Sequence, residues 1–260
     1  MSLQFKRTGP PLAAMLITLL AWEMLVANSA ANFQLVPAPS QIIVALGENA
    51  ERLISLHIPT TLAEAGIGTV LALVAGVALA ALLDAFSLLR RAIYPLLVVS
   101  QTIPIVAIAP VLIIIFGFEM APKIAVVALF GFFPIAVATL DGLTSTEPDL
   151  IALLRSMGAN RWQIWRKVRL PSAMPSLFSG LRIAATYAVG SAILGEFVTA
   201  RAGLGQVIRS GFQQSQSDLV FGVAAISALL SIAFVSLVAL IERLTLRWYY
   251  TESRDSSWQR

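Results

Sequence analysis

Several residue types that build catalytic sites are missing or scarce in this sequence. It contains no cysteine, which excludes a disulfide framework and a thiolate metal site. Its one histidine is His57, so a zinc site or a Ser-His-Asp triad would depend on that residue alone. None of its three lysines, Lys6, Lys123 and Lys167, follows a glycine, and no Gly-x-x-x-x-Gly-Lys-Ser/Thr loop is present. We therefore expect no metal, no bound cofactor and no ATP hydrolysis by that mechanism on this chain.

Charged residues are also scarce. They make up 12% of the 260 residues, while 58% are hydrophobic, and the mean hydropathy is +0.83. A soluble domain is about half apolar and a quarter charged, so a soluble enzyme and a disordered chain are both excluded. The net charge of +4 is typical of loop topology in a membrane protein and does not indicate a nucleic-acid partner. The sequence predicts one integral membrane domain over residues 1–260, in contact with lipid, with no room for a second soluble domain.

Six apolar runs are long enough to span a membrane, which takes about 20 residues. They cover residues 10–31, 58–83, 92–117, 122–141, 176–199 and 219–245. The first resembles a signal peptide, but it is longer than a usual signal segment, so we interpret it as a retained helix. With a cytoplasmic N-terminus, fourteen of the eighteen lysines and arginines fall on the inner side. The predicted fold is an all-α membrane protein with six transmembrane helices and both termini in the cytoplasm.

Two predicted spans carry small residues at a spacing of four. One stripe is Gly68, Ala72, Gly76 and Ala80; the other is Gly180, Ala184, Ala188 and Ala192. Such stripes allow helix backbones to approach closely. They favour helix packing, which is compatible with a moving interface along a transport path.

Polar residues and prolines inside the spans are candidates for a solute path. Gln101 lies beside Pro104, where freed backbone carbonyls need a cavity or a protein partner, although a simple kink is the alternative. Glu196 lies near the outer end of the fifth span and could face the path or hold the following polar segment to the bundle. His57 lies just before the second span, where an interfacial residue needs no special role.

The inner segment 142–175 is the most informative loop. Gly158 suits a turn between two helical stretches, and Trp162, Ile164 and Trp165 could offer an apolar face to a protein groove. The neighbouring cations at 161, 166 and 167 could pair with acidic groups on a partner or with lipid headgroups. From these residues alone, a partner-binding helix and a helix that touches only lipid are both open.

The same loop carries a resemblance to a known family. Gly158 is followed by nine residues and then by Val168-Arg169-Leu170-Pro171, which is similar to the Gly-x9-Ile-x-Leu-Pro spacing of the EAA loop. This loop is typical of the inner-membrane permeases of ATP-binding cassette (ABC) importers. The Glu-Ala-Ala that opens the family's loop is replaced by Ala152-Leu153-Leu154, which leaves a carboxylate contact with the ATPase in doubt. The resemblance extends over residues 58–247 and is greatest to permeases of the nitrate, sulfonate and taurine type. Their relatives import thiamine pyrimidine precursors and riboflavin.

The resemblance implies a type I importer permease in a bacterial inner membrane. A second copy of the chain would complete the path, two cytoplasmic ATPases would use ATP, and an extracytoplasmic binding protein would deliver the solute. The residues expected to couple to the ATPase are Gly158, Ala159, Arg161, Trp162, Trp165, Leu170 and Pro171. The residues considered for the solute path are Gln101, Pro104, Tyr187 and Glu196.

The solute is the least determined part of this hypothesis. Residues 181–188 look more like the heterocycle importers, so a vitamin-type heterocycle such as riboflavin or a thiamine pyrimidine precursor is favoured. Nitrate, a sulfonate and taurine are the alternatives. A stand-alone secondary carrier is a remote alternative, since neither internal repeats nor a buried coupling site is evident.

Overall fold

The chain folds into helices throughout the part that the structure describes. This is a computed structural model, and the described residues are 2–27, 36–100, 102, 104–199 and 201–249. No strand occurs within these ranges. In chain order the helices are α1 (Ser2–Ala27), α2 (Pro39–Glu48), α3 (Ala50–Arg52), the π-helical η1 (Leu53–His57), α4 (Ile58–Ala85), α5 (Ser87–Ser100), α6 (Ile105–Phe116), α7 (Ala121–Thr144), α8 (Pro148–Ser156), α9 (Arg161–Ile164), the π-helical η2 (Trp165–Arg169), α10 (Leu170–Thr199), α11 (Leu204–Gln213) and α12 (Ser217–Thr245).

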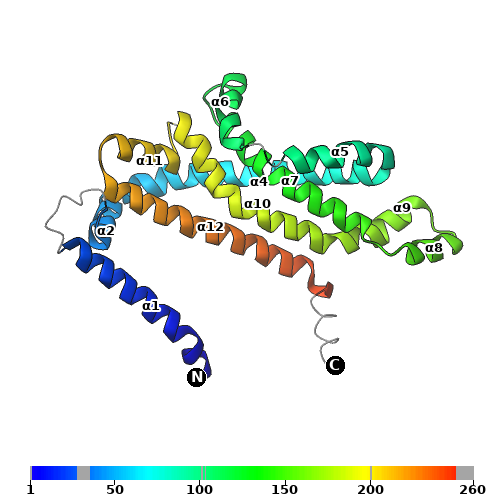
Figure 1. The fold of residues 1–260 in the computed structure, drawn as a ribbon, viewed down its shortest axis with the longest axis horizontal. Coiled ribbons are helices and arrows are strands. Elements are labelled where there is room, and N and C mark those ends of the chain that lie inside the picture. Colours follow the sequence, from blue (N-terminus) through cyan, green and yellow to red (C-terminus); the bar gives the residue numbers. More distant parts are fainter. Residues whose placement is uncertain (1, 28–35, 101, 103, 200, 250–260) are drawn as a thin grey trace.

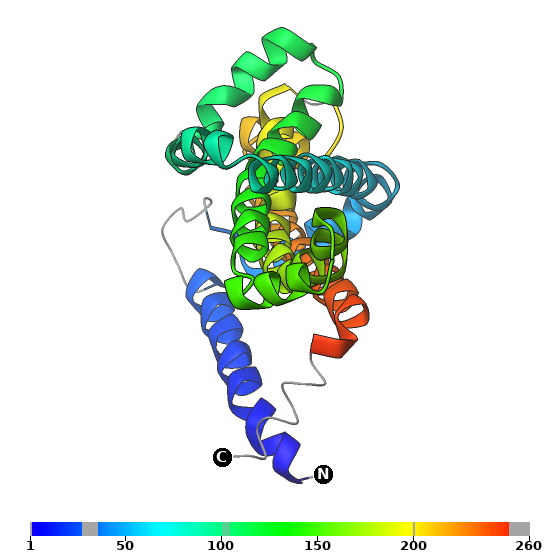
Figure 2. The same ribbon diagram turned by 90° about the vertical axis from the view of Figure 1, so that its right-hand side faces the viewer.

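Four long helices form the body of the molecule. α4, α7, α10 and α12 run along its longest axis, with α2 and α11 at one end and α8 and α9 at the other (Figure 1). α7 packs extensively against both α4 and α10, and α12 packs on α10. α1 extends away from this body in both views (Figures 1 and 2), and it contacts α2 where Ser40 donates to the carboxylate of Glu23.

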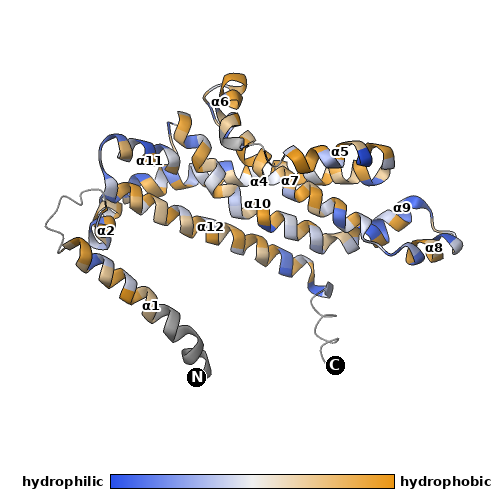
Figure 3. Cartoon of the chain, in the orientation of Figure 1, coloured by the Kyte–Doolittle hydropathy of each residue, from blue (hydrophilic) through white to orange (hydrophobic). Residues whose placement is uncertain are grey.

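Four of the six predicted spans lie on helices that are long and apolar enough to cross a membrane. These helical runs are Ala50–Ala85, Ala121–Thr144, Arg161–Val198 and Ser217–Thr245. Hydrophobic residues line α12 and α6, while hydrophilic residues gather in α9 and α11 at the two ends (Figure 3). The apolar parts of α1 and α6 are shorter than the four long runs. The chain is thus an all-helical multi-pass membrane protein.

The predicted span 92–117 is divided between two helices at its proline break. The structure has two helices here, α5 and α6, and Pro104 stands between them as the N-cap of α6. Proline disfavours the helical conformation of the residue before it and donates no backbone hydrogen bond, so it starts a new helix more easily than it continues one. Pro104 has an extended backbone, with ψ of 102°.

The inner loop 142–175 also ends differently from the prediction. Pro171 and Pro175 do not close it, because α9, η2 and α10 form one helical run, Arg161–Val198. The π-helical turn ends two residues before Pro171, and the Leu170 N–H bonds to the carbonyl five residues back. A π turn widens the helix where a proline ring would otherwise clash with a carbonyl.

A second π-helical turn precedes a proline at the N-terminal end of α4. The π-helical η1 ends at His57, two residues before Pro59, and the Ile58 N–H again bonds five residues back, to Leu53. Both long helices α4 and α10 are therefore extended at their N-terminal ends through a proline. The segment that precedes α4 is helical from Pro39 to His57, apart from Asn49.

The small-residue stripes lie at the helix contacts, which confirms the packing prediction. All eight residues are buried. A Cβ at Gly68 would lie 2.5 Å from Cβ of Val127, and one at Gly76 would lie 2.9 Å from Cγ2 of Ile135. Where α10 meets α7, a Cβ at Gly180 would lie 2.8 Å from Cβ of Ala138. The backbones of α4 and α10 thus approach α7 more closely than larger side chains allow.

Gly68→Ala should destabilise the protein, since its methyl group has no room beside Val127. Overpacking of this kind costs about 1–3 kcal/mol. The measurement is thermal unfolding of the detergent-solubilised protein. The matched control is Gly66→Ala on the same helix, where an added Cβ has no atom within 4 Å. Equal melting temperatures for the two variants would contradict the close α4–α7 contact.

Candidate functional site

The inner loop is a helix-turn-helix, as predicted, and its turn is built at Gly158. After α8, the Ala159 N–H bonds to the Leu154 carbonyl and the Gly158 N–H bonds to the Arg155 carbonyl, both at 3.0 Å. This is the Schellman arrangement, and it needs a left-handed residue at Gly158, where φ is +84°. An added Cβ would meet nothing within 4 Å, so the glycine is required by the backbone alone.

A second cap starts α9 directly after the turn. The Gln163 N–H donates to Oδ1 of Asn160 at 2.8 Å, and the Asn160 N–H donates to Oε1 of Gln163 at 2.9 Å. The sequence analysis missed this reciprocal pair. Its signal is the spacing Asn-x-x-Gln just before a helix, a variant of the capping box. The two caps together fix the angle between α8 and α9.

An aromatic stack stands on the exposed side of α9. The rings of Trp162 and Trp165 are stacked, with centroids 5.3 Å apart and planes 13° apart. Trp162 is 62% exposed, whereas Ile164 is 4% exposed and points into the chain. The predicted apolar face therefore includes the two tryptophans but not Ile164. Arg161 is exposed beside them, and Leu170 and Pro171 lie half-buried at the start of α10.

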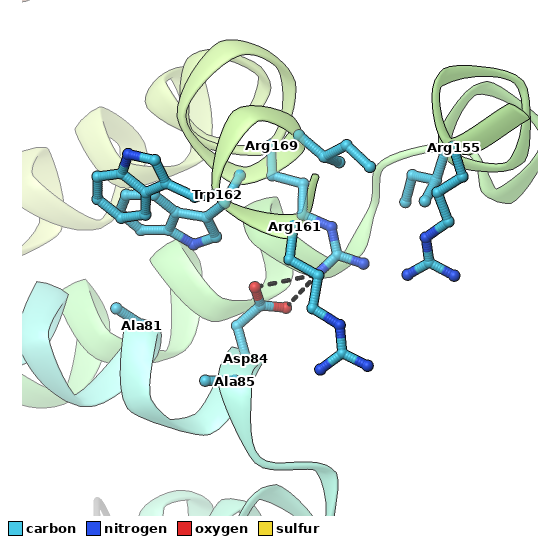
Figure 4. Close-up of a pocket in the computed structure, with 10 residues that line it drawn as sticks. Ala81, Asp84, Ala85, Arg155, Arg161, Trp162 and Arg169 are labelled. Carbon is cyan, nitrogen blue, oxygen red and sulfur yellow. Dashed lines mark hydrogen bonds and ion pairs between the residues drawn. The ribbon is translucent and has the colours of Figure 1, made fainter. Parts of the chain in front are cut away.

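A pocket of about 650 Å³ lies between this loop and the inner end of α4 (Figure 4). The cations that line the pocket are the guanidinium groups of Arg155, Arg161 and Arg169. Arg169 donates from Nη1 to both carboxylate oxygens of Asp84, at 2.8 and 3.0 Å. Asp84 is the last acidic residue of α4, so this ion pair ties α4 to the start of α10. Arg155 and Arg161 make no ion pair within the described part of the chain.

The predicted path residues that the structure describes differ in their exposure. Gln101 lies outside the described residues. Pro104 is exposed at the break before α6. Tyr187 is 53% exposed in the middle of α10, with its ring 6.4 Å from that of Phe130 on α7. Glu196 is completely buried.

Glu196 has its own set of partners at the outer end of α10. Oγ1 of Thr61 donates to one carboxylate oxygen at 2.6 Å, and the Gly205 N–H donates to the other at 2.7 Å. The Leu204 N–H in turn donates to Oγ1 of Thr61 at 2.9 Å. These contacts correspond to the second of the two predicted roles, in which Glu196 holds the following segment to the bundle.

Two more ionisable side chains are buried beside Glu196. Glu64 on α4 is completely buried, and Nζ of Lys123 on α7 lies 3.6 Å from its Oε1. Both Glu64 and Lys123 are within electrostatic range of Glu196. Sequence reasoning assigned Lys123 no role in a site. Its signal is a single cation one residue after Pro122, at the very start of an apolar run.

The fold and the loop define a membrane permease of the binding-protein-dependent kind. Residues 68–247 match the family described as binding-protein-dependent transport system inner membrane components, and the chain belongs to this family. The family prediction made from the loop is confirmed, and the chain is the permease subunit of an ABC importer.

Individual relatives agree with this assignment. The chain is 38% identical over 238 residues to the formylaminopyrimidine transport permease protein ThiX of Halalkalibacterium halodurans, covering 92% of this chain and 95% of that one. It is 40% identical over 160 residues to the riboflavin transport system permease protein RibX of Chloroflexus aurantiacus, covering 62% of this chain and 60% of that one. It is 31% identical over 157 residues to the taurine transport system permease protein TauC of Escherichia coli, covering 60% and 57%. All three are permeases and none is named as an enzyme.

A solved structure shares the fold. A chain of the MetNI methionine ABC transporter in an inward-facing conformation superposes with a TM-score of 0.63, over 76% of this chain and 97% of that chain. The two sequences are 24% identical, so this similarity describes the arrangement of the helices.

The pair Asp84–Arg169 should contribute to stability through its charge and not through packing alone. Asp84→Asn and Arg169→Gln should each lower stability, and the double variant should lose less than their sum. Hydrogen bonds to charged groups contribute about 1.5–3 kcal/mol, which sets the expected coupling energy in a double-mutant cycle. Thermal unfolding in detergent measures it, and strictly additive losses would contradict a direct α4–α10 tie at this point.

Proposed function

We propose that the helix-turn-helix α8–α9 is the contact through which a separate cytoplasmic ATPase drives this permease. The observation that carries the proposal is the continuity of α9, η2 and α10, which makes the loop and a membrane-spanning helix one rigid piece. A force on the exposed Trp162 is therefore transmitted along α10, and through Arg169 and Asp84 to α4. ATP is bound and split by the partner, and this chain performs no bond chemistry.

The chemistry of the loop fits a protein partner better than lipid alone. Trp162 and Trp165 supply a rigid aromatic anchor, and Arg161 beside them has no ion pair within the described residues. Aromatic residues and arginine are the residues that dominate protein interfaces. Where the family has Glu-Ala-Ala, α8 exposes Leu153, so this part of the contact is apolar here.

The topology that accompanies this function has six spans and cytoplasmic termini. α1 and α5–α6 would add two spans to the four long runs, and the cationic loop 142–175 would lie inside. The chain would act as a homodimer in the bacterial inner membrane, with an outer binding protein that delivers the solute. Transport would proceed by alternating access, as binding and ATP shift the populations of two states. A stand-alone carrier would be isolated from membranes without an ATPase, which is the simplest observation against this proposal.

Gly158→Val should abolish most ATP-driven uptake while leaving membrane insertion intact. Valine at a φ of +84° is strained, and the angle between α8 and α9 would change. Uptake into proteoliposomes, together with co-purification of the ATPase, measures the effect. The matched control is Gly158→Asn, since asparagine tolerates the left-handed region. Full transport by the valine variant would overturn the coupling role of this turn.

The solute we propose is a planar heterocycle of the pyrimidine or riboflavin type. The identities to the formylaminopyrimidine and riboflavin permeases, 38% and 40%, exceed the 31% to the taurine permease. Tyr187 also supports it, because a half-exposed aromatic ring beside Phe130 at mid-helix offers a stacking surface. Taurine, a sulfonate and nitrate are the second candidates, supported by the sulfonate and taurine relatives.

The binding protein that serves this permease should be stabilised by a heterocycle. Riboflavin, a thiamine pyrimidine precursor, taurine, an alkanesulfonate and nitrate would be compared in a thermal-shift assay. A ligand at about 100 times its Kd stabilises its protein by about 2.7 kcal/mol, a readable shift. Stabilisation by taurine, a sulfonate or nitrate alone would replace the heterocycle with the second candidate.

A further inference from the structure

We propose that Glu196 is a positioning residue that latches the outer turn, residues 203–205, onto α4 and α10, and that this latch opens and closes during each transport cycle. The proposal rests on the proposed function, because only a permease with alternating access needs its outer end to open. It assigns a role to Glu64, Lys123 and Thr61, which the coupling loop does not use.

Each residue of the outer turn is bound by a side chain from another helix. Gly203 is in hydrogen-bond contact with Nδ1 of His57 at 3.1 Å. Leu204 donates to Thr61, and Gly205 donates to Glu196. Thr61 completes the circuit by donating to Glu196 itself. The backbone of all three residues is thus held by side chains from α4, its π-helical start and α10, and Glu196 is the acceptor on which two of the bonds converge.

The glycines of the turn make this close approach possible. Gly203 has a φ of +107°, and a Cβ there would collide with the carboxylate of Glu196. A Cβ at Gly205 would collide with the Ile193 carbonyl and lie 2.8 Å from Cβ of Glu196. The sequence Gly203-Leu204-Gly205 is therefore shaped to close over one carboxylate, while Leu204 is buried in the apolar cluster beneath α11.

The buried ionic groups around Glu196 favour a contact that opens and closes over a permanent contact. Two carboxyl groups, Glu64 and Glu196, are buried near the ammonium group of Lys123, which lies 3.6 Å from Oε1 of Glu64. Neither oxygen of Glu64 accepts a hydrogen bond from any described residue. Apolar packing of equal volume would hold a static turn as well or better, because buried ionic groups lose their hydration and are best used to select between states.

The latch is connected to the driven end of the molecule by one helix. The helical run Arg161–Val198 starts in the coupling loop and carries Glu196 two residues before its end. Gly195, beside it, lies against the backbone of Lys123, so α10 and α7 cannot slide here without moving the cation. A displacement of α10 relative to α4 would separate Glu196 from Thr61 and release the turn.

A reversible staple tests whether the turn leaves α4. The chain has no cysteine, so the double variant Thr61→Cys, Leu204→Cys introduces the only thiols. It would be assembled with its ATPase and binding protein in proteoliposomes, after the unsubstituted complex has shown ATP-driven uptake. We expect uptake when the pair is reduced, none when it is oxidised, and recovery with a reductant. The two single variants treated with oxidant are the controls. If the oxidised, stapled form takes up solute as fast as the form with free thiols, the latch is overturned.

A second variant keeps the test decisive if the cysteine pair assembles poorly. Glu196→Gln weakens the latch, so we expect ATP hydrolysis in the absence of the binding protein to rise about fivefold or more, a typical coupling factor. Glu242→Gln is the matched control, since Glu242 is also buried but pairs with Arg182 at 3.3 Å, away from the turn. A purely structural Glu196 would lower thermal stability and all activities together without raising basal hydrolysis. Absence of ATP-driven uptake in the unsubstituted complex would instead count against the proposed function itself.

Discussion

The close approach of α7 to its two neighbours is the contact on which the rest of this structure depends. Lipid tails are as apolar as leucine, so helices in a membrane gain little by hiding apolar surface and must instead fit together at short range. Gly68 and Gly76 on α4 and Gly180 on α10 supply that fit. The same proximity brings Lys123, at the start of α7, next to the carboxylates on the other two helices. The polar cluster exists only because the backbones are this near.

The second constraint is the cost of unpaired backbone groups in a membrane, and prolines show how the chain meets it. At Pro59 and Pro171 the helix widens into a π turn and continues. At Pro104 it stops, and a new helix starts. The difference lies in the preceding hydrogen bonds. A carbonyl five residues back accepts the last N–H before Pro59 and Pro171, whereas the Thr102 N–H, ahead of Pro104, bonds to the Val99 carbonyl three residues back. The two continuous runs are the helices that join loop to membrane.

α10 therefore links the two ends of the molecule. Its extension into α9 carries the exposed tryptophan stack, and its other end carries Glu196. The ion pair between Arg169 and Asp84 joins α4 to this run at the inner end, while Thr61 meets Glu196 at the outer end. A permease can switch between two states only if a small displacement at one end changes discrete contacts at the other end. Close-packed helices that carry polar contacts at their ends meet this requirement.

Composition, hydropathy and the spacing from Gly158 to Pro171 were sufficient to predict an all-helical membrane protein, its family and the turn of its inner loop. These features depend on local rules: apolar runs long enough for a bilayer, and a glycine where the backbone is left-handed. The partners of Glu196, the burial of His57 and Lys123, the inward side chain of Ile164 and the helical path through Pro171 depended on tertiary structure. The physical reason is that each of these features depends on which residues of another helix lie beside it. The distances between helices cannot be obtained from a single sequence.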